Sequence, residues 1–128
     1  MISVDTNVLL RALVDDPGEP RQVASARAAL RGAREVQISQ IVQVETVWVL
    51  ETAYGLPKAE VLAVLEHLRG NVGFHLQQRA LFEAALDEFR DGAADFADYL
   101  ILADSRAHKS KLLTFDKRLL KSSDTQSP

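Results

Sequence analysis

Two aspartates stand where an α/β protein would place them at a functional edge. Asp5 and Asp116 each end a short apolar run, ISVD and LLTFD, and such runs are typical of buried parallel strands. The carboxyl ends of parallel strands meet at one edge of the sheet, where ligands bind. An aspartate after a strand is also a common turn residue, so each acid taken alone has a purely structural explanation. The two aspartates together predict that both strands end at the same edge of the sheet.

Glu45 is expected near the same edge, in the second turn of a helix that follows the run VQIS. The residues three and four positions from it are Ile41, Val42, Trp48 and Val49. This pattern predicts a packed face, where an unpaired charge is costly. Glu51 has similar neighbours, but a rise of about 1.5 Å per residue places it roughly 9 Å farther from the strand. Glu45 is therefore the better candidate.

The stretch DFADYL, residues 95–100, places two more aspartates at the start of an expected helix. Both have a structural explanation, because acids accept hydrogen bonds from the first N–H groups of a helix and favour the positive end of its dipole. Asp95 precedes the first turn and is the expected cap. Asp98 has apolar residues at helical spacing around it, which predicts that it faces inward and joins the other acids.

Four carboxylates in one pocket, from Asp5, Glu45, Asp98 and Asp116, require compensation. Each pair repels by about 4 kcal/mol at about 4 Å and an effective dielectric near 20, so the cluster needs protons or cations. Crowding predicts raised pKa values, and hence a metal-free protein that gains stability as pH falls from about 7 toward about 5. Oxygen ligands favour Mg2+ or Mn2+, and such an ion with a bound water suits phosphodiester hydrolysis.

The composition fits one domain of a cytoplasmic protein. With 128 residues, of which 47% are hydrophobic and 26% charged, the chain is long enough for one core. No apolar run approaches the roughly 20 residues of a membrane span, and the N-terminal residues do not resemble an export signal. The absence of cysteine and the three scattered histidines argue against disulfides and against a Cys/His zinc site.

Positive charge is concentrated near the C-terminus, although the net charge of the chain is −3. That net charge argues against coating nucleic acid by bulk electrostatics, but not against an enzyme that holds a short stretch of it. The basic segment contains Arg106, Lys109, Lys111, Lys117, Arg118 and Lys121. It is either a solvated face or a surface that holds RNA phosphates beside Asp116, and both interpretations remain open.

The candidate acids require a framework in which strands alternate with helices. Strands are expected over residues 2–5, 36–39, 72–76 and 111–116. Helices are expected over residues 5–14, 20–32, 40–55, 58–70, 78–92 and 94–110, with a helical turn over 117–122. This alternation predicts right-handed crossovers and a mostly parallel α/β sheet covered on both faces. We expect one domain over residues 1–121 and a frayed polar tail over 122–128.

Four segments, VDTNVLLRAL, SQIVQVETVWVL, ADFADYLILADS and LLTFDKRL, together span nearly the whole chain. At these residues the sequence resembles the PIN-domain family, and within it the VapC-like ribonuclease toxins of bacterial toxin–antitoxin pairs. The resemblance implies a three-layer α/β/α fold with a central, mostly parallel sheet of four or five strands. It also implies that the four acids coordinate Mg2+ or Mn2+ for cleavage of single-stranded RNA. Supporting hydrogen bonds are implied for Thr6, Asn7, Ser39 and Thr114.

The resemblance further implies protein partners. A small VapB-like antitoxin, usually encoded next door, is expected to wrap the toxin with its C-terminal segment and to insert an Arg or Lys among the acids. A homodimer is expected as well. Many relatives continue after the last acid into a short apolar edge strand, whereas this chain turns to KSSDTQSP. Four strands rather than five, and altered dimer contacts on that side, are therefore possible outcomes.

Two other functions compete with the nuclease. A metal-dependent phosphotransfer domain also places acids at strand ends, but it needs an aspartyl nucleophile, usually in an acid pair or a D-x-D motif. Asp5 is followed by TNV, which gives no such motif. A non-catalytic PIN-like module that binds RNA or acts as a scaffold is the second alternative, and the presence of all four acids argues against it.

Overall fold

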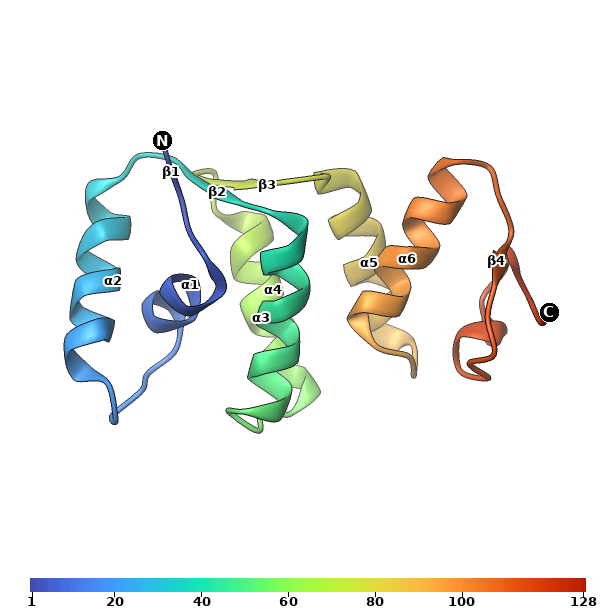
Figure 1. The fold of residues 1–128 in the computed structure, drawn as a ribbon, viewed down its shortest axis with the longest axis horizontal. Helices are drawn as coiled ribbons and strands as arrows, with labels where there is room; N and C mark the ends of the chain where they lie inside the picture. Colours follow the sequence, from blue (N-terminus) through green and yellow to red (C-terminus); the bar gives the residue numbers. More distant parts are fainter. The chain divides into compact units, whose positions relative to one another are not determined.

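A computed structural model describes all residues, 1–128, and divides the chain into two compact units, residues 1–77 and 78–128 (Figure 1). Each unit is described by itself. The first contains β1 (Ile2–Ser3), α1 (Thr6–Leu13), α2 (Pro20–Gly32), β2 (Val36–Ile38), α3 (Gln40–Thr52), α4 (Lys58–Gly70) and β3 (Phe74–Leu76). The second contains α5 (Arg79–Asp91), α6 (Phe96–Ala107), β4 (Leu112–Leu113), the 3-10 helix η1 (Leu119–Lys121) and β5 (Thr125–Gln126).

The first unit is built on a small parallel sheet. Its strands lie in the order β1-β2-β3, and all neighbours are parallel. Val36 lies opposite Phe74 in the ladder, and Ile38 lies opposite Leu76; all four are buried. The residues between them are exposed, as expected from the alternation of side chains along a strand. The apolar side of the ladder therefore faces the core.

The helices of the first unit pack on this sheet and on one another. α1 contacts α2 and α3, α3 contacts α4, and α4 contacts β3. Leu9 and Leu10 of α1 and Leu50 of α3 are completely buried. Gly55, predicted to stop α3, has a φ of 62°. Glycine adopts this left-handed conformation without strain, and the turn lets the N–H of Leu56 donate to the carbonyl oxygen of Leu50 at 3.0 Å.

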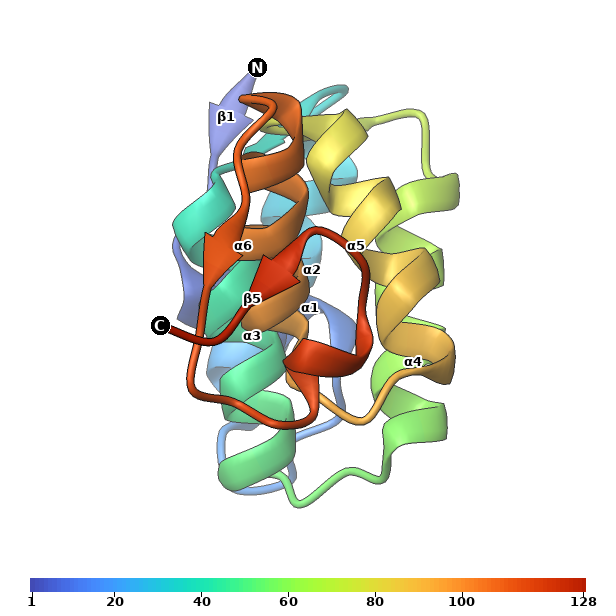
Figure 2. The same ribbon diagram turned by 90° about the vertical axis from the view of Figure 1, so that its right-hand side faces the viewer.

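The second unit is organised around the pairing of α5 with α6. The ring of Phe96 contacts those of Phe82 and Phe89 edge to face, with both centroid distances 5.8 Å. Between the two helices, Gly92 allows the side chain of Tyr99 to approach the backbone. A Cβ atom at this position would lie 1.8 Å from the Tyr99 hydroxyl, so only glycine fits here. Figure 2 shows the two helices side by side.

The α/β class, with a parallel sheet and six helices, is confirmed. The sheet of the first unit has three strands, and in the second unit β4 pairs with β5 in a parallel sheet of two strands (Figures 1 and 2). The N–H of Leu112 donates to the carbonyl oxygen of Asp124 at 2.9 Å, and that of Thr114 to Gln126 at 3.0 Å. The tail expected to fray thus supplies a strand, because its backbone satisfies the exposed edge of β4. The domain boundary after residue 121 stays a prediction.

No helix of the chain combines the length and the apolar character needed to cross a bilayer.

Candidate carboxylate site

Asp5 lies just beyond the carboxyl end of β1 and caps α1. Its Oδ1 accepts a hydrogen bond from the N–H of Val8 at 3.0 Å, which explains why the helix begins at Thr6. The side chain is exposed. Because an ionised carboxylate accepts hydrogen bonds or metal ions at both oxygens, the cap leaves room for a ligand. The predicted position of Asp5 at the end of the first strand is confirmed to within two residues.

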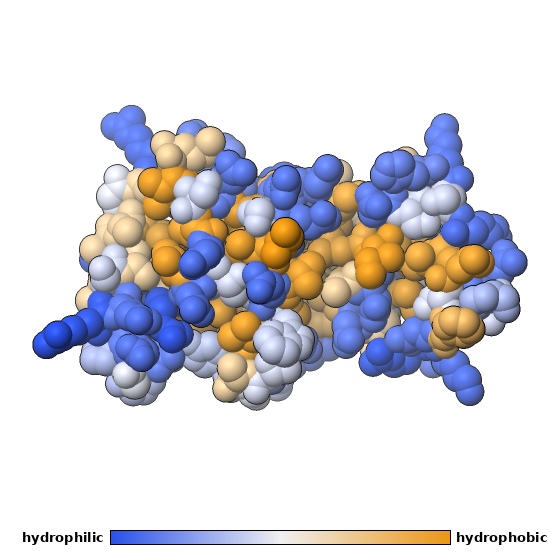
Figure 3. All heavy atoms as spheres, in the orientation of Figure 1, coloured by the Kyte–Doolittle hydropathy of each residue, from blue (hydrophilic) through white to orange (hydrophobic).

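Glu45 is exposed on α3, so the expectation of a packed face around it is wrong. The neighbouring residues Ile41 and Trp48 are 72% and 63% exposed. Figure 3 shows hydrophobic residues, in orange, among the polar ones on this face of the surface. The buried stripe of α3 consists of Val42, Gln43, Thr46, Val47 and Leu50. α3 carries apolar residues around most of its circumference, so their spacing did not reveal which face is buried.

Thr6 connects the first two candidate acids. Its hydroxyl donates to Oε1 of Glu45 at 3.0 Å, which joins the start of α1 to the second turn of α3. Since Thr6 directly follows Asp5, this bond holds the Glu45 carboxylate beside the segment that carries Asp5. The supporting role predicted for Thr6 thus has a structural counterpart within the first unit.

Two side chains fix the start of α3 against the end of the sheet. Ser39, predicted as a cap, accepts a hydrogen bond from the N–H of Val42 at 3.3 Å. Gln43, which sequence reasoning missed, donates from Nε2 to the carbonyl oxygens of Ile38 at 3.3 Å and Gln77 at 2.9 Å. These carbonyls lie at the ends of β2 and β3. Gln43 therefore positions the helix that carries Glu45.

A signal for Gln43 was present in the sequence. It occupies the same helical stripe as Val47 and Leu50, and it is completely buried. A polar residue in an apolar stripe must find hydrogen-bond partners, and strand ends offer free carbonyl groups. Gln77 completes the arrangement, because its side-chain oxygen accepts from the N–H of Gln40 at 2.8 Å.

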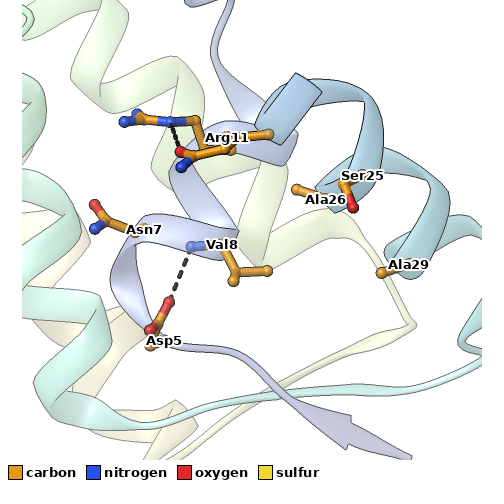
Figure 4. A pocket seen from close by; sticks show the side chains of 8 residues that line it. Asp5, Asn7, Val8, Arg11, Ser25, Ala26 and Ala29 are labelled. Carbon is orange, nitrogen blue, oxygen red and sulfur yellow. Dashed lines mark hydrogen bonds between the residues drawn. The ribbon is translucent and has the colours of Figure 1, made fainter. Parts of the chain in front are cut away.

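A pocket of about 390 Å³ opens between α1 and α2, with Asp5 among its lining residues (Figure 4). It is lined by Asp5, Asn7, Val8 and Arg11 on one side and by Gln22, Ser25, Ala26 and Ala29 on the other. Asn7, predicted as a supporting residue, is exposed here. Arg11 is held in place by Gln22, to which its Nε donates at 3.0 Å, and by Asp16, 3.1 Å from its Nη1. The pocket offers polar and apolar surface directly beside Asp5.

Asp95 and Asp98 together form a capping box at the start of α6. Asp95 is the N-cap, which confirms the predicted cap, and its N–H donates to Oδ2 of Asp98 at 3.1 Å. Asp98 therefore has a structural role at the start of the helix, as its position in the first turn allows. Its side chain is half-buried, whereas that of Asp95 is exposed. The bond to Asp95 orients the Asp98 carboxylate without neutralising its charge.

Asp116 follows β4, and its carboxylate is hydrogen-bonded to Arg118. Its Oδ1 accepts from the backbone N–H of Arg118 at 2.8 Å and from Nε at 3.2 Å, and its Oδ2 accepts from Nη2 at 2.9 Å. The N–H of Leu119 adds a bond of 3.4 Å. Thr114, predicted as a supporting residue, accepts from the N–H of Asp116 at 3.0 Å.

The hydrogen bonds from Arg118 lower the pKa of Asp116 to about 2. The raised pKa expected from crowding is therefore wrong for this residue.

Arg118 also lies close to the start of α6. Its Nη1 donates to the carbonyl oxygen of Ala93 at 3.4 Å, and its Nη2 lies 3.9 Å from Oδ2 of Asp95. Asp116 most strongly, and Asp95 and Asp98 by their charges, raise the pKa of Arg118. The guanidinium of Arg118 thus interacts with Asp116, Asp95 and Asp98.

The basic segment separates into two groups. Arg106 pairs with Glu88 and Asp124 and donates to Ser123, and Arg118 pairs with Asp116, so both arginines serve contacts within the unit. The lysines are exposed. They are Lys109, Lys111, Lys117 and Lys121.

A comparison with protein families adds to this geometry. The family described as "PIN domain" matches residues 2–123. The chain belongs to the PIN-domain family. PIN domains are typically nucleases that use divalent metal ions, which supports a hydrolase. No curated protein matches the sequence significantly.

The donor set of this PIN domain fits a hard divalent ion in its chemistry. Each unit supplies two predicted ligands, Asp5 and Glu45 in the first and Asp98 and Asp116 in the second, and carboxylate oxygens are the ligands that Mg2+ and Mn2+ prefer. Neither unit contains a group of three or more His, Asp or Glu side chains that could hold a metal ion. The roles of these four acids as metal ligands stay predictions.

Proposed function

We propose that this PIN domain is a Mg2+- or Mn2+-dependent endoribonuclease that hydrolyses phosphodiester bonds of single-stranded RNA. The observation that carries this proposal is the family match over residues 2–123, which includes all four predicted ligands. When bound, the ion supplies charge stabilisation at a phosphoryl oxygen and a water of lowered pKa. Asp5, Glu45, Asp98 and Asp116 are the proposed ligands.

The residues around these carboxylates support the proposal by orienting them in advance. Thr6 holds Glu45 through its hydroxyl, and the N–H of Asp95 holds Asp98. Neither bond brings a positive charge, so both carboxylates keep the charge that a cation requires. Preorganised ligands lower the cost of ordering the site when the ion and the substrate bind.

The four exposed lysines of the basic segment are the proposed phosphate contacts. The ion pairs of the segment are made by Arg106 and Arg118, whereas the four lysines are exposed. All four lie close to Asp116 in the sequence. Lysine ammonium groups attract phosphates as point charges and do not need the fixed geometry of an arginine. We propose that the segment is an RNA-binding surface rather than only a solvated face.

We further propose that the protein is the cytoplasmic, VapC-like toxin of a toxin–antitoxin pair and forms a homodimer. A ribonuclease in the cytosol must be restrained. The exposed carboxylate of Glu45 lies between the exposed side chains of Ile41 and Trp48, which suits a partner segment with apolar residues and one basic residue. A small VapB-like antitoxin is the proposed partner, with an arginine whose planar fork engages carboxylates.

Incubation of the purified protein with a mixed pool of single-stranded RNA tests the nuclease. Cleavage is expected with Mn2+ or Mg2+ and not with a chelator. RNA binding without cleavage at any Mn2+ concentration would favour the non-catalytic module instead.

Co-expression with the adjacent small open reading frame tests the toxin. A stable complex with suppressed cleavage is expected, and replacing the partner's basic residue nearest the acids should restore part of the activity. Harmless expression of the protein alone, without a neighbour-encoded partner, would contradict the toxin assignment and leave the nuclease assignment standing.

A further inference from the structure

Asp116 differs from the other proposed ligands in that a single residue occupies both of its oxygens. The two side-chain bonds from Arg118, 3.2 Å from Nε to Oδ1 and 2.9 Å from Nη2 to Oδ2, form the parallel fork of a bidentate pair. The backbone N–H of Arg118 adds a third bond to Oδ1. A metal ion that binds Asp116 directly would either lie beside the guanidinium charge or replace one of these hydrogen bonds.

The ion pair between Arg118 and Asp116 is also partly exposed to solvent, so that its two side chains can separate. The side chain of Arg118 is 47% exposed, and that of Asp116 is 28% exposed. The remaining contacts of the guanidinium are weak by geometry, since the bond to Ala93 is 3.4 Å long and the distance to Asp95 is 3.9 Å. A partly exposed ion pair contributes little to stability, so a divalent ion can displace it.

We propose that Arg118 competes with the divalent cation for the carboxylate of Asp116 and is released when the ion binds. This inference rests on the proposed function, because it takes Asp116 as a ligand. Arg118 then sets the metal concentration at which the site fills, and it neutralises Asp116 while the ion is absent. In this role Arg118 acts only through Asp116 and contacts neither the ion nor the substrate.

Mn2+ affinity, measured by calorimetry on metal-free protein, tests the competition without relying on activity. Arg118→Gln should bind Mn2+ about tenfold more tightly than the wild type, because the competing charge and fork are lost. Lys117→Gln is the matched control, since it removes one positive charge from the neighbouring, exposed position. Its affinity should rise by less than about threefold, because exposed charges are screened.

Arg118→Lys provides a second variant that keeps the charge and removes the fork. It should bind Mn2+ with an affinity between those of the wild type and Arg118→Gln, and it carries the test if Arg118→Gln does not fold. The wild type offers an independent measurement: the Nε–H resonance of Arg118, assigned by its loss in Arg118→Lys, should shift and exchange faster with water as Mg2+ saturates the protein.

The outcomes separate this inference from the proposed function. Equal or weaker Mn2+ binding by Arg118→Gln, or an Nε–H resonance that ignores saturating Mg2+, overturns the competition and leaves the metal-dependent nuclease intact. Failure of the wild type and of all variants to bind Mn2+ overturns both.

Discussion

The two pairs of candidate carboxylates in this PIN domain accept hydrogen bonds from different kinds of donor. In the first unit, Asp5 and Glu45 accept hydrogen bonds from neutral donors, the N–H of Val8 and the hydroxyl of Thr6. In the second unit, Asp98 also accepts from a neutral N–H, but Asp116 is held by the guanidinium of Arg118. Neutral donors orient a carboxylate and leave its charge, whereas a guanidinium also cancels it. Arg118 therefore neutralises Asp116, whereas the donors to Asp5, Glu45 and Asp98 bring no positive charge.

The largest expected effect concerns Asp98, the acid of the second unit that a neutral donor orients. Asp98→Asn should lower kcat/KM for RNA cleavage by about 100-fold or more, because a metal ion supplies several kcal/mol of charge stabilisation and 1.36 kcal/mol is tenfold in rate. The asparagine oxygen still accepts from the N–H of Asp95, so the cap survives. Asp95→Asn is the control and should be tolerated, since asparagine caps helices well. Comparable losses in both folded variants would show that the division between cap and ligand is wrong.

A smaller effect is expected at Thr6, the neutral donor of the first unit. Thr6→Val keeps the shape and removes the bond to Glu45, which should lower kcat/KM about fivefold, since a hydrogen bond contributes about 1 kcal/mol. Thr6→Ser keeps the hydroxyl and should retain wild-type activity. If valine were as active as threonine, or serine as impaired as valine, the orienting role of Thr6 would be disproved.

The smallest effect is the pH dependence of stability in the second unit. The pKa of Asp116 is lowered to about 2 from an ordinary value of 3.8, so the folded state holds this proton less tightly than the unfolded state. The resulting stability is complete above about pH 4 and is lost as pH falls toward about 2. Metal-free Arg118→Gln should therefore lose stability less steeply over this range, as measured by urea unfolding. Parallel curves for wild type and variant would contradict the assigned pairing.

The sequence predicted the framework well and the surroundings of the acids less well. Strand and helix positions follow from apolar periodicity and from caps such as Ser39 and Asp95, which are local properties of the chain. The pairing of β4 with β5 was missed, because the polar side chains of Thr125 and Gln126 give no apolar pattern and the pairing uses only the backbone. Partners of charged groups were missed for a related reason: nothing in the spacing of Asp116 and Arg118 distinguishes an ion pair from two solvated side chains.

The central proposal is that Asp5, Glu45, Asp98 and Asp116 bind one metal ion. Mn2+ titration of metal-free wild type, Asp5→Asn, Asp98→Asn and the double variant tests it most directly. If the pairs share a site, each single variant should weaken all Mn2+ binding by about tenfold or more, and the double variant should lose less than the sum of the two losses. If instead each single variant retained half of the bound Mn2+ at wild-type affinity, the pairs would bind separate ions and the account of a shared site would be contradicted.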